Sequence, residues 1–323
     1  MLGWVKEAMG VSKKDISNFW SEGAVLPFDE ENRHIRLDDL VSFWNDPMAW
    51  FWKQRLQLRE RKDELKLSDR ENYSDNGLVT WKLRDRYFQQ LEEGVLDEAF
   101  QKQRAHLDPS LSIAPLSDLA VGAAIKTVAD LQTAKQRLTN EAKSETCPIE
   151  LSIDIQGQAW VLSGEIDSLY DHRMVEVYVG RLKAKHLMAA LIRWAAWQCM
   201  THESKSLSLL SNGYEANGPK GAQKVAQVDC YEQGGVTPET AQRFLAVMIQ
   251  GYIEGQKKPL TLTPLLALQT IWKFNETEIL DEELASDWSA LLPQRGQHEM
   301  GGECLKALGA TYAKQIAEIL GWG

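Results

Sequence analysis

The feature that most constrains the fold is a change in the spacing of apolar residues near the middle of the chain. In the segment 149–154 (IELSID) every second residue is apolar, which is the pattern of a half-buried strand. Before and after this region the apolar residues recur at intervals of three and four, which is typical of amphipathic helices. Helices and strands that alternate in this way bury their apolar faces by packing helices on a sheet. The sequence therefore predicts an α/β fold.

Helices are predicted throughout the first half of the chain. The segment 37–56 begins with acidic residues and continues with apolar residues at helical spacing, and Pro47 should break it into two helices. Further helices are expected over 77–93, 95–106 and 116–143. Several tryptophans fall in helical stretches, and we expect the following five to be buried: Trp44, Trp50, Trp52, Trp194 and Trp197.

The second half is predicted to form a small mixed sheet followed by helices. Strands are expected over 149–154, 159–162 (continuing through 164–167 towards a turn) and 175–179, an amphipathic helix over 184–200, and weaker strands over 207–210 and 225–230. The remaining helices are predicted over 238–255, 264–274, 282–291 and 303–320.

Charge, cysteine spacing and hydropathy exclude several classes of protein. The formal net charge of −10 argues against a protein that grips DNA over its whole surface, because such binding depends on Lys and Arg. A local basic patch or a partner chain would have to supply any DNA contact. The four cysteines include no close pair, so we expect reduced thiols and no metal cluster. No apolar run approaches a bilayer span and no signal peptide is evident, so we expect a cytoplasmic protein without a cofactor.

The order strand–turn–strand–Asp–turn–strand–helix is similar to the core of the PD-(D/E)XK (restriction-endonuclease-like) nucleases. There, two acidic residues hold a divalent ion that activates water, and a Lys two residues after the second acid lies on the same strand face. Asp167 and Glu176 stand at the acidic positions, but Tyr178 stands at the lysine position. A neutral phenol cannot supply a positive charge at pH 7. The resemblance therefore predicts a degenerate core with vestigial motif positions, a small mixed sheet and many flanking helices.

Two longer motifs resemble the C-terminal domain of RecC. The segment 37–58 (LDDLVSFWNDPMAWFWKQRLQL) is similar to the opening of that domain, and the segment 251–264 (GYIEGQKKPLTLTP) is similar to the stretch that follows its sheet. We therefore expect residues 1–35 to be a connector from an upstream region and residues 36–323 to be a RecC C-terminal nuclease-like domain. Its parts would be a helical region over 36–145, a sheet core over 146–235 and a second helical region over 236–323.

The resemblance implies a subunit without catalytic activity of its own. Active relatives of the RecB type carry a His on the helix before the sheet, and Val121 stands at that point here. The implied partners are RecB-like and RecD-like subunits and DNA, as single strands and at a fork. The implied role is strand separation and channelling in double-strand break repair and recombination, with no metal, no cofactor and no membrane.

Two alternatives remain open at this stage. The first is an active Mg²⁺-dependent nuclease that uses Asp167, Glu176 and a displaced Lys183 or Lys185. The second is an unrelated helical adaptor that binds proteins through tryptophan-rich faces, and it predicts no central mixed sheet.

Overall fold

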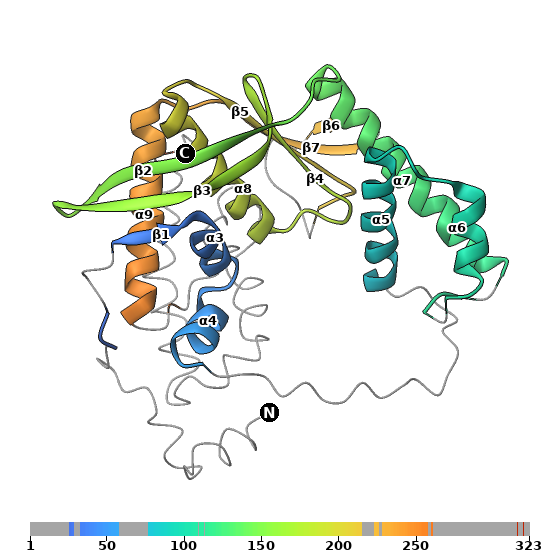
Figure 1. Cartoon of the computed structure of the whole chain (residues 1–323), viewed down its shortest axis with the longest axis horizontal. Helices are drawn as coiled ribbons and strands as arrows, with labels where there is room; N and C mark the ends of the chain where they lie inside the picture. Colours follow the sequence, from blue (N-terminus) through green and yellow to red (C-terminus); the bar gives the residue numbers. More distant parts are fainter. Residues whose placement is uncertain are drawn as a thin grey trace, which may run out of the picture.

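The computed structural model describes residues 26–28, 33–57, 77–108, 110–112, 114–214, 223–225, 228–257, 260, 315 and 319 (Figure 1). The predicted helices over 264–274, 282–291 and 303–320 lie outside these residues, apart from positions 315 and 319. The elements follow in this order: β1 (His34–Arg36), α3 (Leu37–Asn45), α4 (Pro47–Trp50), the π-helical turn η1 (Phe51–Arg55), α5 (Gly77–Glu92), α6 (Glu98–Ala105), α7 (Leu116–Thr139), β2 (Glu145–Ile155), β3 (Gln158–Tyr170), β4 (Arg173–Tyr178), α8 (Ala184–Thr201), β5 (Ser206–Ser211), β6 (Gln223–Val225), β7 (Val228–Gln233) and α9 (Pro238–Lys257).

The strands form one mixed sheet of seven strands. Its order is β1-β3-β4-β5-β7-β6, and β2 pairs with β3. The pairs β1–β3 and β4–β5 are parallel, whereas the others are antiparallel. The predicted α/β class with a mixed sheet and several helices is therefore confirmed. The sheet also excludes the alternative of a purely helical adaptor.

Two predictions about the strands were wrong. The first half of the chain is not all helical, because β1 pairs in parallel with residues 161–163 of β3. Three residues are too few to show an alternating pattern, and β1 exists because the edge of β3 supplies its hydrogen-bonding partners. The single strand expected over 225–230 is two strands, β6 and β7, which pair with each other.

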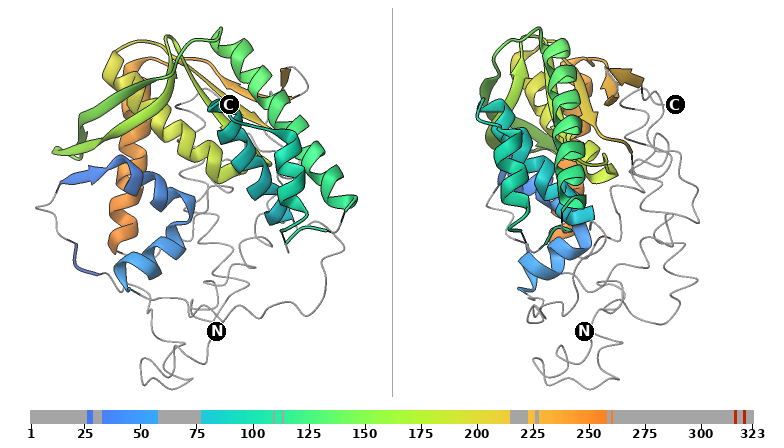
Figure 2. Two further views of the ribbon diagram at one scale, coloured as in Figure 1. Left: turned by 45° about the vertical axis from the view of Figure 1, so that its right-hand side comes forward. Right: turned by 90° about the vertical axis from the view of Figure 1, so that its right-hand side faces the viewer.

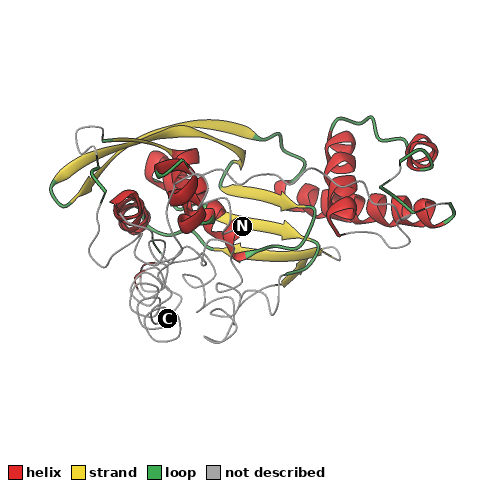
Figure 3. Ribbon diagram, turned by 90° about the horizontal axis from the view of Figure 1, so that it is seen from below, coloured by secondary structure: helices red, strands yellow, loops and turns green. Residues whose placement is uncertain are grey.

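The helices divide into two groups that pack on opposite faces of the sheet (Figures 2 and 3). One group, α3, α8 and α9, shares an apolar core with β2 and β3, whereas α5 and α7 share a second core with β4, β5 and β7. Successive strand residues enter opposite cores: Leu209 lies in the first and Leu210 in the second. Both faces of the central strands are thus buried, as is usual where helices cover a sheet on two sides.

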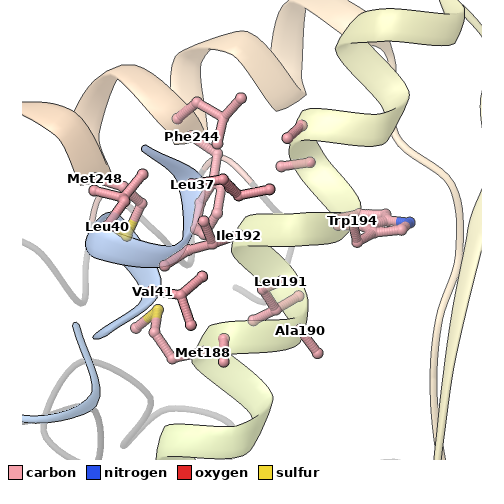
Figure 4. Packing of buried hydrophobic residues seen from close by; sticks show 14 of the residues in the cluster. Leu37, Leu40, Val41, Met188, Ala190, Leu191, Ile192, Trp194, Phe244 and Met248 are labelled. Atoms are coloured by element: carbon pink, nitrogen blue, oxygen red, sulfur yellow. The ribbon is translucent and has the colours of Figure 1, made fainter. Parts of the chain in front are cut away.

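The first core depends on close packing between helices (Figure 4). Leu37, Leu40 and Val41 of α3 face α8 and α9, and all three side chains are buried. Gly255 of α9 allows the Phe43 ring of α3 to approach so closely that an added Cβ would lie 2.3 Å from Phe43 Cζ. Four of the five tryptophans expected to be buried are at most 4% exposed, and Trp50 is half-buried.

Pro47 separates the first two helices as predicted. Helix α3 ends at Asn45 and α4 begins at Pro47, where the missing N–H of proline costs no helical hydrogen bond. Among the described helices, none is both long enough and apolar enough to cross a bilayer.

Candidate functional site

The candidate site lies where strands β3 and β4 diverge. Only two residue pairs join them, Leu169 with Met174 and Tyr170 with Arg173, whereas β4 pairs with β5 along its whole length. The divergence opens a cleft of about 600 Å³. Its lining residues are Asp38, Thr146, Glu165, Asp167, Ser168, Glu176, Val177, Tyr178 and Arg193. Three of the four predicted motif positions, Asp167, Glu176 and Tyr178, therefore meet in one cleft.

A β-bulge positions Asp167 at this cleft. Asp167 and Ser168 of β3 lie opposite the single residue Thr146 of β2, since the flanking pairs are Ile166–Cys147 and Leu169–Glu145. Ser168 has a φ of 62°, in the left-handed region. A bulge of this kind bends a strand and changes the direction of its side chains, and such bulges are frequent near functional sites. Asp167 is exposed to solvent.

Glu176 is held by an arginine from the helix beneath the sheet. Its side chain leaves β4 towards α8, on the same face as Met174, because strand side chains alternate. Arg193 donates from Nε to Oε1 at 2.8 Å and from Nη2 to Oε2 at 2.9 Å. The Glu176 side chain is only 13% exposed and that of Arg193 25%. This is a partly buried, bidentate ion pair, the strongest geometry available to a guanidinium and a carboxylate.

Tyr178 completes the arrangement around Glu176. Its hydroxyl donates to Glu176 Oε2 at 2.5 Å, and its ring stacks on His186 with the centroids 4.7 Å apart. Burial, followed by the negative charge of Glu176, raises the pKa of Tyr178 far above its usual value. The phenol is therefore neutral and acts as a hydrogen-bond donor.

Electrostatics maintain the charge of the arginine. Burial lowers the pKa of the Arg193 guanidinium, but the attraction of the Glu176 carboxylate and, more weakly, of Asp167 outweighs it, and the pKa is raised overall. Arg193 therefore provides a permanent positive charge at the base of the cleft.

The residues of the cleft do not fit a divalent ion in this arrangement. Mg²⁺ binds through carboxylate oxygens, but both oxygens of Glu176 already accept hydrogen bonds from Arg193. No group of three or more His, Cys, Asp or Glu side chains suited to a metal occurs among the described residues. The arrangement can neutralise a carboxylate and order the side chains around it.

The other sequence candidates lie outside this cleft. Lys183 and Lys185, considered as displaced catalytic lysines, are exposed at the start of α8 and are not among the residues that line the cleft. Val121 is fully buried in the second core, between α7 and its neighbours. The structure therefore brings together the two acidic residues and the tyrosine but neither lysine.

Sequence reasoning missed Arg193 and His186 as parts of this site. A signal for Arg193 was present, because it is the one charged residue in the otherwise apolar run of residues 187–197. A charge on the buried stretch of a helix requires a partner, and the acidic candidates of the sheet were the available ones. His186 showed no such signal, because its stacking on Tyr178 depends on the angle between β4 and α8.

Comparisons with known proteins place this geometry in context. A family model for the RecC C-terminal domain matches residues 32–275. The RecBCD enzyme subunit RecC of Haemophilus influenzae is 25% identical over 267 residues, which cover 76% of this chain and 21% of that protein. The corresponding subunit of Buchnera aphidicola is 22% identical over 235 residues, covering 72% and 20%. The chain thus spans about a fifth of the length of these curated relatives. A solved structure, "Crystal structure of SSO0001", aligns over 77% of this chain and 87% of that one at 16% identity, but its TM-score of 0.24 is too low to support an argument.

Proposed function

Because the chain belongs to the RecC C-terminal domain family, we propose that it serves as a non-catalytic, DNA-guiding domain of a RecC-like subunit. Its partners would be RecB-like and RecD-like subunits and DNA, and its setting the repair of double-strand breaks and recombination. The name of both relatives, RecBCD enzyme subunit RecC, supports the choice of partners.

The proposal that the domain is non-catalytic rests on the ion pair between Glu176 and Arg193. Metal-dependent hydrolysis of a phosphodiester needs acidic ligands with oxygens available to the ion. Here a guanidinium engages both oxygens of Glu176, and Tyr178 stands where the nuclease motif has its lysine. The domain would keep the scaffold of the cleft without the groups that cut DNA.

We also propose that residues 36–323 form a degenerate PD-(D/E)XK domain with a helical part (36–145), a sheet core (146–235) and a second helical part (236–323). The strand carrying Asp167, the hairpin to the strand carrying Glu176, and helix α8 after it support this assignment. The vestigial motif positions would be Asp167, Glu176, Tyr178 and Val121.

Co-expression with the RecB-like and RecD-like chains of the same genome tests the proposed function. We expect the chain, within its full-length subunit, to purify with both partners, and we expect the isolated chain to leave single-stranded DNA intact in the presence of Mg²⁺ or Mn²⁺. Failure to associate with either partner would contradict the proposed role. DNA digestion by the isolated chain that stops with EDTA and with Asp167→Ala would instead establish the active-nuclease alternative.

A further inference from the structure

Three cations follow the end of strand β4: two precede helix α8 and the third lies in its first turn. Arg181, Lys183 and Lys185 are exposed, whereas Leu182 between the first two is buried and forms a parallel bridge with Tyr214. The backbone at Lys183 is extended, with φ −106° and ψ 156°. Side chains two residues apart on an extended backbone lie on the same side at a spacing of about 7 Å. Arg181 and Lys183 therefore point to the same side of the chain, and Lys185 follows in the first turn of α8.

Arg181 and Lys185 occupy a position that is electrostatically unfavourable for the protein alone. Positive side chains near a helix N-terminus are repelled by the helix dipole. The first turn of α8 contains no acidic residue to offset them, and neither Arg181 nor Lys185 pairs with a carboxylate among the described residues. The pKa of His186 is lowered to about 4, first by burial and then by the charges of Lys185, Lys183 and Arg193. An anionic ligand would relieve this repulsion.

An exposed tryptophan lies beside the cations. Trp81 of α5 is 45% exposed, although tryptophan side chains are highly buried on average. Its Cδ1 atom lies 3.0 Å from where a Cβ of residue 180 would be, so Gly180, next to Arg181, allows the indole to pack on the backbone at the end of β4. An accessible indole next to a row of cations combines a stacking surface with phosphate-binding groups, which is how many proteins hold single-stranded nucleic acid.

The cleft itself is unsuited to the same ligand. Four carboxylates, those of Asp38, Glu165, Asp167 and Glu176, line it against the single guanidinium of Arg193. Without a bound metal this lining repels phosphate groups. A strand that approaches the domain would therefore contact it beside the cleft, where the local charge is positive although the net charge of the chain is −10.

We propose that Trp81, Arg181, Lys183 and Lys185, together called the β4–α8 surface, bind single-stranded DNA without sequence preference. The cations would contact successive phosphates, and one unpaired base would stack on the Trp81 indole. The choice of DNA over another polyanion rests on the proposed function, whereas the position of the surface rests on the geometry described above.

The test measures binding of the full chain to a fluorescent oligo(dT) of about 20 nucleotides, longer than a typical single-fold site. The variant Arg181→Gln/Lys185→Gln is compared with the control Lys126→Gln/Arg243→Gln, which removes the same charge from exposed positions on α7 and α9. Loss of two phosphate contacts should reduce the slope of log affinity against log salt concentration by about 1.4, and the control should leave it unchanged. Trp81→Ala should weaken binding at least about fivefold at constant salt through the loss of one stacked base.

The outcomes separate this inference from the proposed function. Three results would each overturn the proposed surface. The paired variant and its control could have equal effects on binding, or the chain could bind duplex and single-stranded DNA with equal affinity. Poly-glutamate could also displace the oligonucleotide while Trp81→Ala has no effect on affinity. If the subunit assembles with its RecB-like and RecD-like partners but the chain does not bind oligo(dT), the surface is refuted and the proposed function stands. If the chain binds oligo(dT) as predicted but the subunit does not assemble, the surface stands and the proposed function fails.

Discussion

Replacement of Arg193 by Met should destabilise the domain because it leaves the Glu176 carboxylate without its counter-charge. The methionine retains much of the apolar volume of the arginine stem, so the main loss is electrostatic. Glu176 is only 13% exposed and would lose both hydrogen bonds donated by the guanidinium, retaining the one from Tyr178.

The expected cost can be worked out from these contacts. Removing one partner of a buried ion pair costs about 3–5 kcal/mol, and partial access of water to this pair lowers our estimate to about 2–4 kcal/mol. Glu176→Gln should lower the free energy of unfolding by less, about 1–2 kcal/mol. The guanidinium of Arg193 is 25% exposed to water, and the negative charge of Asp167 remains near it. In the double variant no unpaired charge remains, so it should be more stable than Arg193→Met, with a coupling energy larger than the cost of Glu176→Gln alone, about 1–2 kcal/mol.

Urea unfolding at pH 7, followed by far-ultraviolet circular dichroism, provides the assay. The matched control is Lys102→Met, which breaks the exposed ion pair between Lys102 and Glu98 within helix α6. An exposed pair of this kind contributes little, so the urea midpoint should be unchanged within error. The reasoning would be refuted if Arg193→Met were as stable as the wild type, or if the costs of the two single variants simply added.

Three further predictions follow from contacts described above. The pKa of His186 is lowered from 6.5 to about 4, mainly by burial, so the native state holds a neutral imidazole while the unfolded chain takes up a proton below pH 6.5. The stability that comes from keeping this imidazole neutral is therefore present above pH 6.5 and is lost as the pH falls towards 4. In urea titrations, His186→Phe should make the free energy of unfolding depend less on pH between 6.5 and 4. Gly255→Ala should lower the free energy of unfolding by about 1–3 kcal/mol because its Cβ would overlap the Phe43 ring, whereas Gly122→Ala, with open space around the added Cβ in the middle of α7, should raise it by about 0.5–1 kcal/mol. Millimolar Mg²⁺ should not raise the melting temperature above that in EDTA, and a rise that Glu176→Gln abolishes would show that the ion displaces Arg193.

The sequence predicted the parts of the fold that depend on local periodicity. The alternation in the segment 175–179 correctly placed Glu176 and Tyr178 on one face of a strand, and the apolar spacing in 184–200 matched α8 closely. These patterns are visible because each element buries one continuous face. The boundaries were less accurate, as with α7, which ends at Thr139 and not at residue 143.

The parts that could not be predicted depend on contacts between distant residues. Strand β1 is defined by its pairing with β3, more than a hundred residues away, and its own three residues have no strand signature. The cleft exists because β3 and β4 separate after two residue pairs, which no pattern within either strand specifies. The Glu176–Arg193 pair joins a strand to a helix across the first core, so its partners were visible individually but their contact was not.

The ion pair between Glu176 and Arg193 also bears on how this chain could change during evolution. Exchanging Tyr178 for lysine would add an ammonium group beside the existing guanidinium of Arg193. Losing Arg193 first would leave the partly buried carboxylate of Glu176 without its counter-charge. Each step towards a metal-binding arrangement is therefore disadvantageous until the other has occurred. A lineage that carries this arginine would therefore need both exchanges to reach a metal-binding arrangement, and no single mutation would achieve it.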